Sequence, residues 1–352
     1  MSLADGNPER DAPTRPKARG AGQGFLGAIA RTPTPLIFIS CVILAILLLW
    51  WQGQVHEIIS IVARARLQPL LIAAPIYVVS LWLLCLRWHL LVRMAQGWSD
   101  FPRASEAFLT SVVINYAAPI GLAVPSRAAL TKRALGLDHG TTGTIALWEI
   151  GADVLVLGAG SVLWLFLAEG STSAVGSELS ASAGQYARWG GVAIVLVLLT
   201  LAWSLRSPGR RRRFLGLAQK ILVAPSVRPI EALMSIGVTL VYWMIQGVVL
   251  ALLVHAMRVD ISFEFILGLT SVPILVGMLS PIPGGAVVRE ALMYVVARLA
   301  DVPAGEVVAA AVIYRIALFG AIPILYALTR WWISRRVHHQ SNPSRHEPVG
   351  TA

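Results

Sequence analysis

The chain has 352 residues, of which 56% are hydrophobic and 13% are charged, whereas ordinary soluble domains carry about 25% charged residues. Its apolar residues form nearly charge-free blocks close to the roughly 20 residues that cross a bilayer, which excludes an ordinary soluble protein and predicts an all-α polytopic membrane protein. The net charge of +11 comes from basic residues in loops beside these blocks, a pattern typical of membrane orientation rather than of nucleic-acid binding.

The two ends of the chain are polar. Residues 1–34 are expected to form a disordered cytoplasmic tail, because they are rich in Gly, Pro and Arg and show no apolar period. The first apolar block ends in Trp50–Trp51 rather than at a small-residue cleavage site, which favours a signal-anchor helix over a signal peptide. Residues 334–352 are expected to form a second polar cytoplasmic tail, so that the membrane domain spans 35–333.

Six apolar segments are long enough to cross the membrane. The loop at 206–229 carries the basic run Arg210–Arg213, whereas 170–187 contains no Lys or Arg. Because cytoplasmic loops carry the excess of basic residues, we expect both termini in the cytoplasm and the protein in the inner membrane. Arg64 and Arg66 fit this topology less well, since it places their loop outside. The expected crossings are at about 36–51, 69–92, 142–168, 188–205, 231–256 and 307–332.

Two further apolar segments, 104–136 and 264–299, are interrupted by Pro and Gly. The first is broken around residues 115–121 and at Pro125, and the second is broken at 281–285. Proline removes a backbone donor and clashes with the preceding turn, so we expect re-entrant helix–break–helix hairpins instead of continuous helices. Such backbone is tolerated at membrane depth only where it is buried in protein or lines a wet cavity.

The two hairpins occupy equivalent places in two halves of the chain, about 69–168 and 231–332, which the basic loop joins. Each hairpin follows a long apolar helix that contains Trp, and each has a basic residue shortly after its break, Arg127 or Arg289. In the expected topology the hairpins enter from opposite faces, which predicts an inverted repeat with a midplane site between the halves. Alternatively, the two breaks are similar by chance, because Pro and Gly are common in membrane helices.

Several charged residues lie inside the expected membrane segments, where a charge normally marks a functional interior. Glu149 and Asp153 are four residues apart and therefore share one helical face. Tyr314-Arg315 lies at a comparable depth in the last crossing, and Arg289-Glu290 directly follows the second break. The alternative is that these charges pair, Arg289 with Glu290 or Glu149 and Arg315 with Asp153, and merely hold the bundle together.

Common catalytic and cofactor motifs are absent from the sequence. There is no phosphate loop, zincin motif or nucleophile elbow, so we expect neither an ATP-driven pump nor another enzyme, and no cofactor or metal. The match Gly22-x-Gly24-x-x-Gly27 lies in the N-terminal tail without a preceding strand and does not predict dinucleotide binding. Cys41 and Cys85 lie within apolar blocks and are expected to pack rather than to form a disulfide.

The chain resembles the transmembrane, flippase-like family of lysylphosphatidylglycerol synthases over about residues 36–332. The resemblance implies two pseudo-symmetric halves with re-entrant helices, and movement of a lipid between leaflets. The soluble aminoacylating domain of the full-length synthases is expected to be absent, which favours lipid handling over lipid synthesis. The residues that carry the resemblance are Trp82…Arg87-Trp88, Asn115…Pro119…Gly121…Arg127, Pro281-Ile-Pro-Gly-Gly285…Arg289-Glu290 and Tyr314-Arg315.

We therefore expect a lipid flippase or transporter, in which a phosphate-bearing headgroup enters a chamber between the hairpins while the lipid chains stay in the bilayer. The resemblance implies aminoacyl-phosphatidylglycerol, a polyprenyl-linked sugar or a related lipid as the substrate. The alternatives are an integral-membrane transferase that modifies a lipid, and a non-transporting partner of lipid-synthesis enzymes; the sequence indicates no oligomeric state. The expected substrate-binding residues are Arg127, Arg289, Glu290, Arg315, Tyr314, Glu149, Asp153, Asn115, Gly284 and Gly285.

Overall fold

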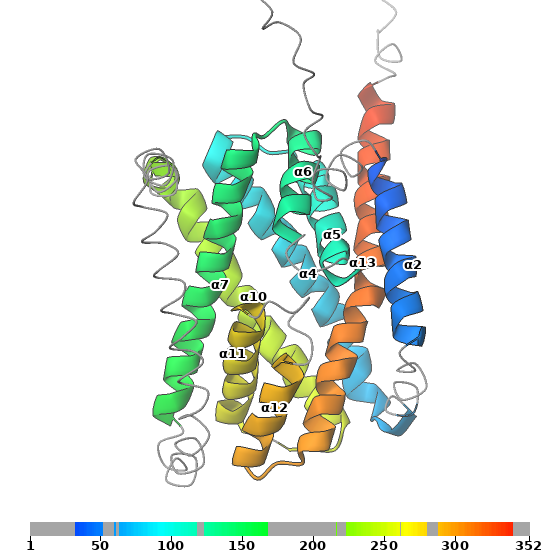
Figure 1. Ribbon diagram of the computed structural model, residues 1–352, viewed down its shortest axis with the longest axis vertical. Helices are drawn as coiled ribbons and strands as arrows, with labels where there is room; N and C mark the ends of the chain where they lie inside the picture. Colours follow the sequence, from blue (N-terminus) through cyan, green and yellow to red (C-terminus); the bar gives the residue numbers. More distant parts are fainter. Residues whose placement is uncertain are drawn as a thin grey trace, which may run out of the picture.

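A computed structural model describes residues 32–51, 60, 63–117, 123–167, 216, 223–260, 262–279 and 288–340 of the chain. The helices in this part of the chain are α2 (Thr34–Trp51), α4 (Leu67–Gln96), α5 (Phe101–Ala117), α6 (Ala123–Leu135), α7 (His139–Leu167), α10 (Pro229–Ala256), α11 (Phe263–Leu279), α12 (Val288–Leu299) and α13 (Ala304–Gln340) (Figure 1).

Four of these helices, α4, α7, α10 and α13, are long and apolar enough to cross a membrane. They match four of the six predicted crossings, α2 matches a fifth, and the crossing predicted at 188–205 lies outside the described residues. Large apolar side chains such as Leu71, Leu155 and Leu233 point outward on these helices, each more than half exposed. Contiguous apolar surface of this kind is stable against lipid and not against water, so the protein is a polytopic α-helical membrane protein.

The two segments with predicted breaks are each built from a pair of shorter helices. The first consists of α5 and α6, separated by residues 118–122, and the second consists of α11 and α12, separated by residues 280–287. Helix α5 continues through Asn115, and Pro125 lies in the first turn of α6 rather than at a break. Proline is tolerated there because the N–H groups of a first helical turn have no intrahelical acceptor.

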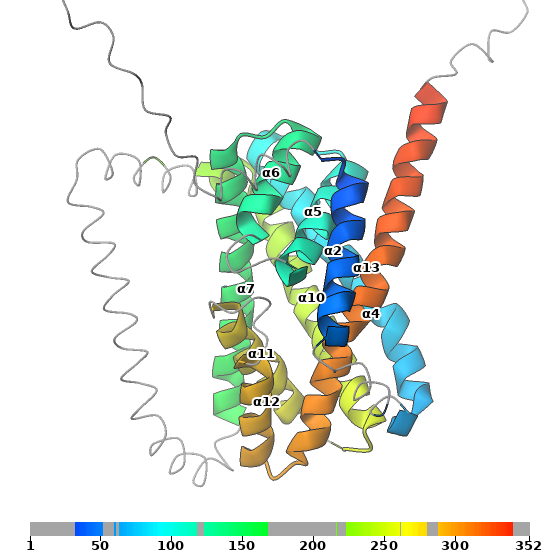
Figure 2. The same cartoon turned by 45° about the vertical axis from the view of Figure 1, so that its right-hand side comes forward.

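The two helix pairs lie at opposite ends of the bundle. In both views α5 and α6 occupy the upper half, whereas α11 and α12 occupy the lower half (Figures 1 and 2). Between them α4 and α10 pack along each other through the centre. The two pairs therefore approach the middle of the molecule from opposite directions.

Helices α4 and α10 run antiparallel, and their ends contact each other reciprocally. The backbone N–H of Arg66, the residue before α4, donates to the carbonyl of Ala256 at the end of α10 over 2.8 Å. Arg228, the residue before α10, donates from Nη1 to the carbonyls of Arg93 and Met94 near the end of α4, over 3.1 and 3.0 Å. The residue that precedes each helix thus donates to carbonyls at the C-terminal end of the other helix, where few or no N–H donors of the same helix remain; the carbonyl of Arg93 also accepts from the N–H of Gly97.

The remaining contacts follow the same reciprocity. Helix α7 packs against α11, and α13 packs against α5. Helix α6 contacts α5 and α7, as α12 contacts α11 and α13. Each of these contacts has a counterpart that is also observed. The counterpart is obtained when α4 is exchanged with α10, α5 with α11, α6 with α12 and α7 with α13. The last helix of each half is therefore packed against the hairpin of the other half.

The contact between α7 and α11 depends on small residues. A Cβ atom at Gly268 of α11 would lie 2.5 Å from the indole of Trp164 on α7. At Gly160 of α7 it would lie 3.3 Å from Cβ of Ser271. The two helices can approach this closely only because glycine has no side chain.

We predict that Gly268→Ala lowers the thermal unfolding midpoint of the protein in detergent, because the added methyl group collides with Trp164; overpacking of this kind costs about 1–3 kcal/mol. Gly151→Ala is the matched control, since a Cβ atom at this exposed helical position meets nothing within 4 Å. The control should raise the midpoint or leave it unchanged, because alanine stabilises a helix interior relative to glycine by about 0.5–1 kcal/mol. Equal midpoints for the two variants would contradict the close α7–α11 contact.

Candidate functional site

Arg87 of α4 is the centre of a first charge cluster, which also contains Arg127, Glu149 and Asp153. Its Nη1 donates to Oδ1 of Asp153 over 2.5 Å, and its Nη2 donates to Oε1 of Glu149 over 2.6 Å. Both carboxylates lie on one face of α7, four residues apart, as the sequence predicts. Arg87 is 3% exposed, Glu149 5% and Asp153 4%. Two carboxylates at this spacing can be held by one guanidinium group because its N–H donors form a fixed fork.

Arg127 of α6 completes the first charge cluster. It forms an ion pair with the second oxygen of Glu149, and its Nε donates to Oγ of Ser111 on α5 over 2.9 Å. The guanidinium group lies over the rings of Trp88 and Phe108, at 5.1 and 4.7 Å from their centroids. Two arginines and two carboxylates make this cluster neutral, and aromatic faces supply further attraction for the cation.

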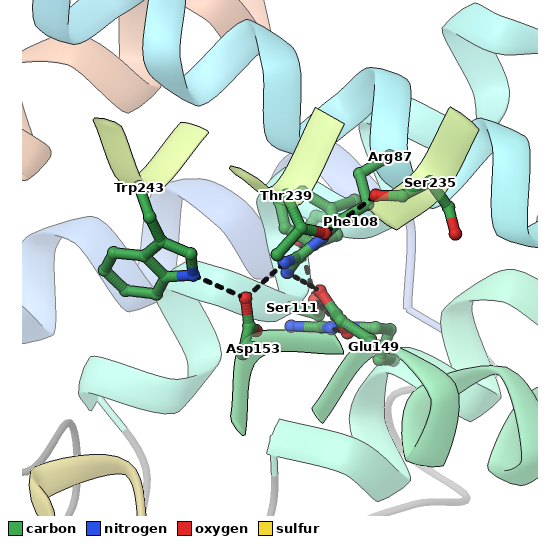
Figure 3. A network of polar contacts seen from close by, with 9 residues as sticks. Arg87, Phe108, Ser111, Glu149, Asp153, Ser235, Thr239 and Trp243 are labelled. Atoms are coloured by element: carbon green, nitrogen blue, oxygen red, sulfur yellow. Dashed lines mark hydrogen bonds and ion pairs between the residues drawn. The ribbon is translucent and has the colours of Figure 1, made fainter. Parts of the chain in front are cut away.

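The first charge cluster also connects the two halves of the chain. Nε1 of Trp243 on α10 donates to Oδ1 of Asp153 over 2.8 Å, and Arg87 donates to the same oxygen (Figure 3). Helices α4, α7 and α10 are therefore tied together by hydrogen bonds between the buried side chains of Arg87, Asp153 and Trp243. Breaking such a set of buried ion pairs is costly because it leaves a charge uncompensated in a low-dielectric interior.

A second charge cluster consists of Arg289 and Glu290 on α12 with Arg315 on α13. Nη1 of Arg315 donates to Oε1 of Glu290 over 3.1 Å, and Nη2 of Arg289 lies 3.9 Å from the same oxygen. The guanidinium group of Arg289 lies over the ring of Tyr314, 5.1 Å from its centroid. Two arginines share one carboxylate, so this cluster carries one uncompensated positive charge.

The uncompensated charge is located at Arg289, which is 8% exposed. Its Nε and Nη2 have no hydrogen-bond partner among the residues that the structure describes. A buried cation whose N–H donors form no hydrogen bonds costs several kcal/mol, unless an anion or another acceptor binds it. The arrangement is therefore suited to hold an anionic group.

Buried aromatic residues lie beside both clusters. Tyr77 of α4 contacts Tyr314 edge-on at a centroid distance of 5.3 Å, and Tyr242 packs against Trp243 at 4.8 Å. Trp243 donates to Asp153 of the first cluster, and Tyr314 lies under Arg289 of the second. All four aromatic residues belong to the main hydrophobic core.

The structure brings together seven of the residues predicted for the site, in two clusters instead of one. Of the ion pairs considered, Arg289 with Glu290 is present, at 3.9 Å. The pairing of Arg315 with Asp153 is wrong, because Arg87 binds both carboxylates of α7 and Arg315 pairs with Glu290 instead. Asn115 lies near the end of α5, and Gly284 and Gly285 lie outside the described residues. The seven residues are Arg127, Glu149, Asp153, Arg289, Glu290, Tyr314 and Arg315.

Arg87 was not among the predicted site residues. Only its position in the sequence indicates that Arg87 is a candidate, since it is a charged residue within the apolar block at 69–92. A charge inside a membrane segment is itself grounds to expect a buried partner.

We predict that Arg87→Met destabilises the protein strongly, by about 3–5 kcal/mol, because Glu149 and Asp153 lose their shared counter-ion. Arg93→Met is the matched control on the same helix, where the side chain is 46% exposed and pairs with Glu231 at 3.6 Å. Such an exposed pair contributes about 0–1 kcal/mol. Thermal unfolding in detergent measures both, and a similar small shift for the two variants would show that the Arg87 network does not hold the helices together.

Comparison with known protein families gives a match over most of the chain. The family described as "Lysylphosphatidylglycerol synthase TM region" matches residues 37–326, which include both charge clusters. A comparison with curated proteins finds no match.

Proposed function

The chain belongs to the lysylphosphatidylglycerol synthase transmembrane family, and we propose that it moves a lipid with a phosphate-bearing headgroup between the leaflets of the membrane. The observation that carries this proposal is the buried, uncompensated positive charge at Arg289. Aminoacyl-phosphatidylglycerol and polyprenyl-linked sugars are lipids of this class.

The free edge of Arg289 has the geometry that phosphate prefers. Nε and Nη2 lie side by side on one edge of the planar guanidinium group, and both are without a hydrogen-bond partner in the described part of the chain. Arginine binds phosphate through two parallel N–H···O bonds from such an edge. The ring of Tyr314 lies against one face of the group, and Glu290 pairs with both Arg289 and Arg315. A headgroup phosphate would neutralise the remaining charge.

The proposed movement uses an inverted repeat of α4–α7 and α10–α13. The antiparallel packing of α4 and α10 and the reciprocal contacts of the other helices support this symmetry. Folds of this type open their midplane site to one side and then the other by rocking one repeat against its partner. Arg127 follows the break of the first repeat as Arg289 follows the break of the second, and we assign it to the headgroup in the opposite leaflet, where the phosphate would replace Glu149 as its partner.

The hairpins are proposed to be re-entrant. Helices α6 and α12 have 13 and 12 residues, so they extend about 18–20 Å at 1.5 Å per residue. The hydrocarbon core of a bilayer is about 30 Å thick. Neither helix reaches across it, and each hairpin would return to the face from which it entered.

The C-terminal end of α13 supports a cytoplasmic location for both termini in the inner membrane. Arg335 lies over the ring of Trp331 at 3.9 Å, and Arg336 lies over Trp332 at 5.2 Å. Tryptophan marks the membrane interface, and basic residues next to it mark the cytoplasmic side. The start of α2 lies at the same end of the bundle (Figure 1).

We predict that the protein, reconstituted in liposomes, accelerates the loss of fluorescence of labelled phosphatidylglycerol when an impermeant reductant is added. Arg289→Ala should slow this acceleration by about 10-fold or more, since the charge-assisted hydrogen bonds to phosphate are worth about 1.5–3 kcal/mol. Arg298→Ala removes an exposed arginine of the same helix and should retain the wild-type rate.

The outcome that contradicts transport is a wild-type rate equal to that of empty vesicles with every anionic lipid tested. Equal rates for wild type and Arg289→Ala would show that transport does not use this arginine.

A further inference from the structure

One end of the bundle is hollowed by a cavity of about 570 Å³. The cavity lies where the segment before α4, the end of α10 and the start of α13 meet, at the lower end of these helices in Figure 1. Arg258 lines it at the end of α10, and Gly305 and Ala309 line it at the start of α13. This is the end remote from the C-terminal part of α13.

The inverted repeat proposed above gives this cavity a counterpart place at the opposite end of the bundle. The same number of residues separates Leu67 from Pro229, the starts of α4 and α10, as separates Phe101 from Phe263, the starts of α5 and α11. Exchanging α4 with α10 and α7 with α13 puts the counterpart where the segment before α10, the end of α4 and the start of α7 meet. In Figure 1 these three parts lie at the upper end of the bundle.

The side chain of Arg228 bridges the start of α10 and the end of α4 at this counterpart place. Its Nη1 donates to the carbonyls of Arg93 and Met94 over 3.1 and 3.0 Å. The guanidinium group lies against Gly97, where a Cβ atom would be 2.5 Å from Nη2 of Arg228 and 3.0 Å from its Cζ. Gly97 also has a φ of 88°, so that glycine suits both the turn and the close approach of the arginine.

The hollow end is built differently, although the same elements form it. Arg66 precedes α4 as Arg228 precedes α10, but it contacts the end of α10 through its backbone N–H, which donates to Ala256, and its side chain is exposed. The residue of positive φ after α10 is Arg258, at 64°, and its side chain lines the cavity. An arginine side chain therefore crosses between α4 and α10 at the upper end, and a cavity lies at the lower end.

The bridge made by Arg228 is of a kind that can break and form again. The carbonyls that it binds are neutral, so it lacks the attraction between opposite charges that holds Arg87 to Glu149 and Asp153. Arg228 is only partly buried, and water can replace the carbonyls as its hydrogen-bond partners. Separation of α4 from α10 at this end therefore leaves no charge buried without a partner.

We propose that Arg228 closes a second mouth, on the cytoplasmic side, and that the structure is the conformation open to the opposite side. The inference rests on the proposed transport and deepens it, because it names the residue that controls access from the cytoplasm. When one repeat rocks against the other, Arg228 leaves the carbonyls of α4 and the cytoplasmic mouth opens. A protein without this side chain populates the conformation open to the cytoplasm more often.

The test is the rate at which a charged, membrane-impermeant thiol reagent labels a cysteine at the closed mouth, in the full chain in nanodiscs. The reporter is Thr144→Cys, in a chain that also carries Cys41→Ala and Cys85→Ala and so has no other thiol. Thr144 is the sixth residue of α7, as Ala309 is the sixth residue of α13. Ala309 lines the open cavity, whereas Thr144 is 5% exposed.

We expect Arg228→Ala to raise the labelling rate of the reporter about 10-fold, because it removes the hydrogen bonds that favour the closed mouth. Arg66→Ala is the matched control and should keep the rate of the parent protein, since alanine retains the backbone N–H that Ala256 accepts from. An unchanged rate in Arg228→Ala overturns the proposal.

A second reporter separates opening of the mouth from loosening of the whole bundle. Cys85 lies in the interior of α4 and is 2% exposed. In a chain that keeps Cys85 as its one thiol and has the native Thr144, Arg228→Ala should leave the labelling rate unchanged. Equal acceleration of labelling at Cys85 and at Thr144→Cys overturns the proposal, because it shows that the variant unfolds rather than opens.

Gly97→Ala tests the same contact from α4, because its Cβ atom takes the place of the guanidinium group of Arg228. It should accelerate labelling of the reporter as Arg228→Ala does, and the two changes together should accelerate it no further. Gly136→Ala is the matched control for the turn, since Gly136 has a φ of 74° and a Cβ atom there meets nothing within 4 Å. Equal rates for Gly97→Ala and Gly136→Ala contradict the role of Arg228.

The proposed closure and the proposed transport can fail separately, because the labelling needs no lipid substrate. Faster labelling in Arg228→Ala, in a protein that moves no lipid, contradicts the transport and supports the closure by Arg228. Unchanged labelling in a protein that moves lipid contradicts the closure alone.

Discussion

The cost of burying charge in a medium without water is the constraint on which the rest of this structure depends. The two charge clusters contain four arginines and three carboxylates, and an ion that loses its water costs several kcal/mol unless a partner replaces it. The first charge cluster is neutral, with each carboxylate of α7 bound by Arg87, although Nε of Arg87 has no hydrogen-bond partner among the described residues. The second cluster does not, since Glu290 is shared by two arginines. A neutral cluster can hold helices together, and a cluster with excess charge can recruit an anion.

The same constraint explains why the two halves of the chain are packed as they are. The bilayer provides no hydrophobic force between apolar helices, so packing, small residues and hydrogen bonds must bring them together. Gly268 supplies close packing between the halves, and Trp243 supplies a hydrogen bond to Asp153 across them. Exposed leucines remain on the outside for the lipid chains.

Much of this architecture is predictable from sequence, because apolar length, proline and charge act locally. The predicted segments at 69–92 and 231–256 correspond to α4 and α10, and both predicted interruptions occur between paired helices. The partners of the buried charges are not predictable in this way, since they depend on how each helix is rotated about its own axis. Arg87 faces α7 while Arg315 faces α12, and no single-helix pattern distinguishes these two outcomes. The effect of Pro125 is also not predictable from the sequence alone, because it depends on whether the residue lies in the first turn or in the interior of a helix.

The central claim is that the edge of Arg289 formed by Nε and Nη2, which has no hydrogen-bond partner among the described residues, binds the phosphate of a lipid headgroup between the two repeats. An electron cryomicroscopy structure of the full chain in nanodiscs that contain an aminoacylated or other phosphate-bearing lipid tests it most directly. The expected result is density for a phosphate group about 2.7–3.2 Å from both Nε and Nη2 of Arg289. Density in which a protein carboxylate occupies that edge, with no headgroup nearby, would contradict the claim.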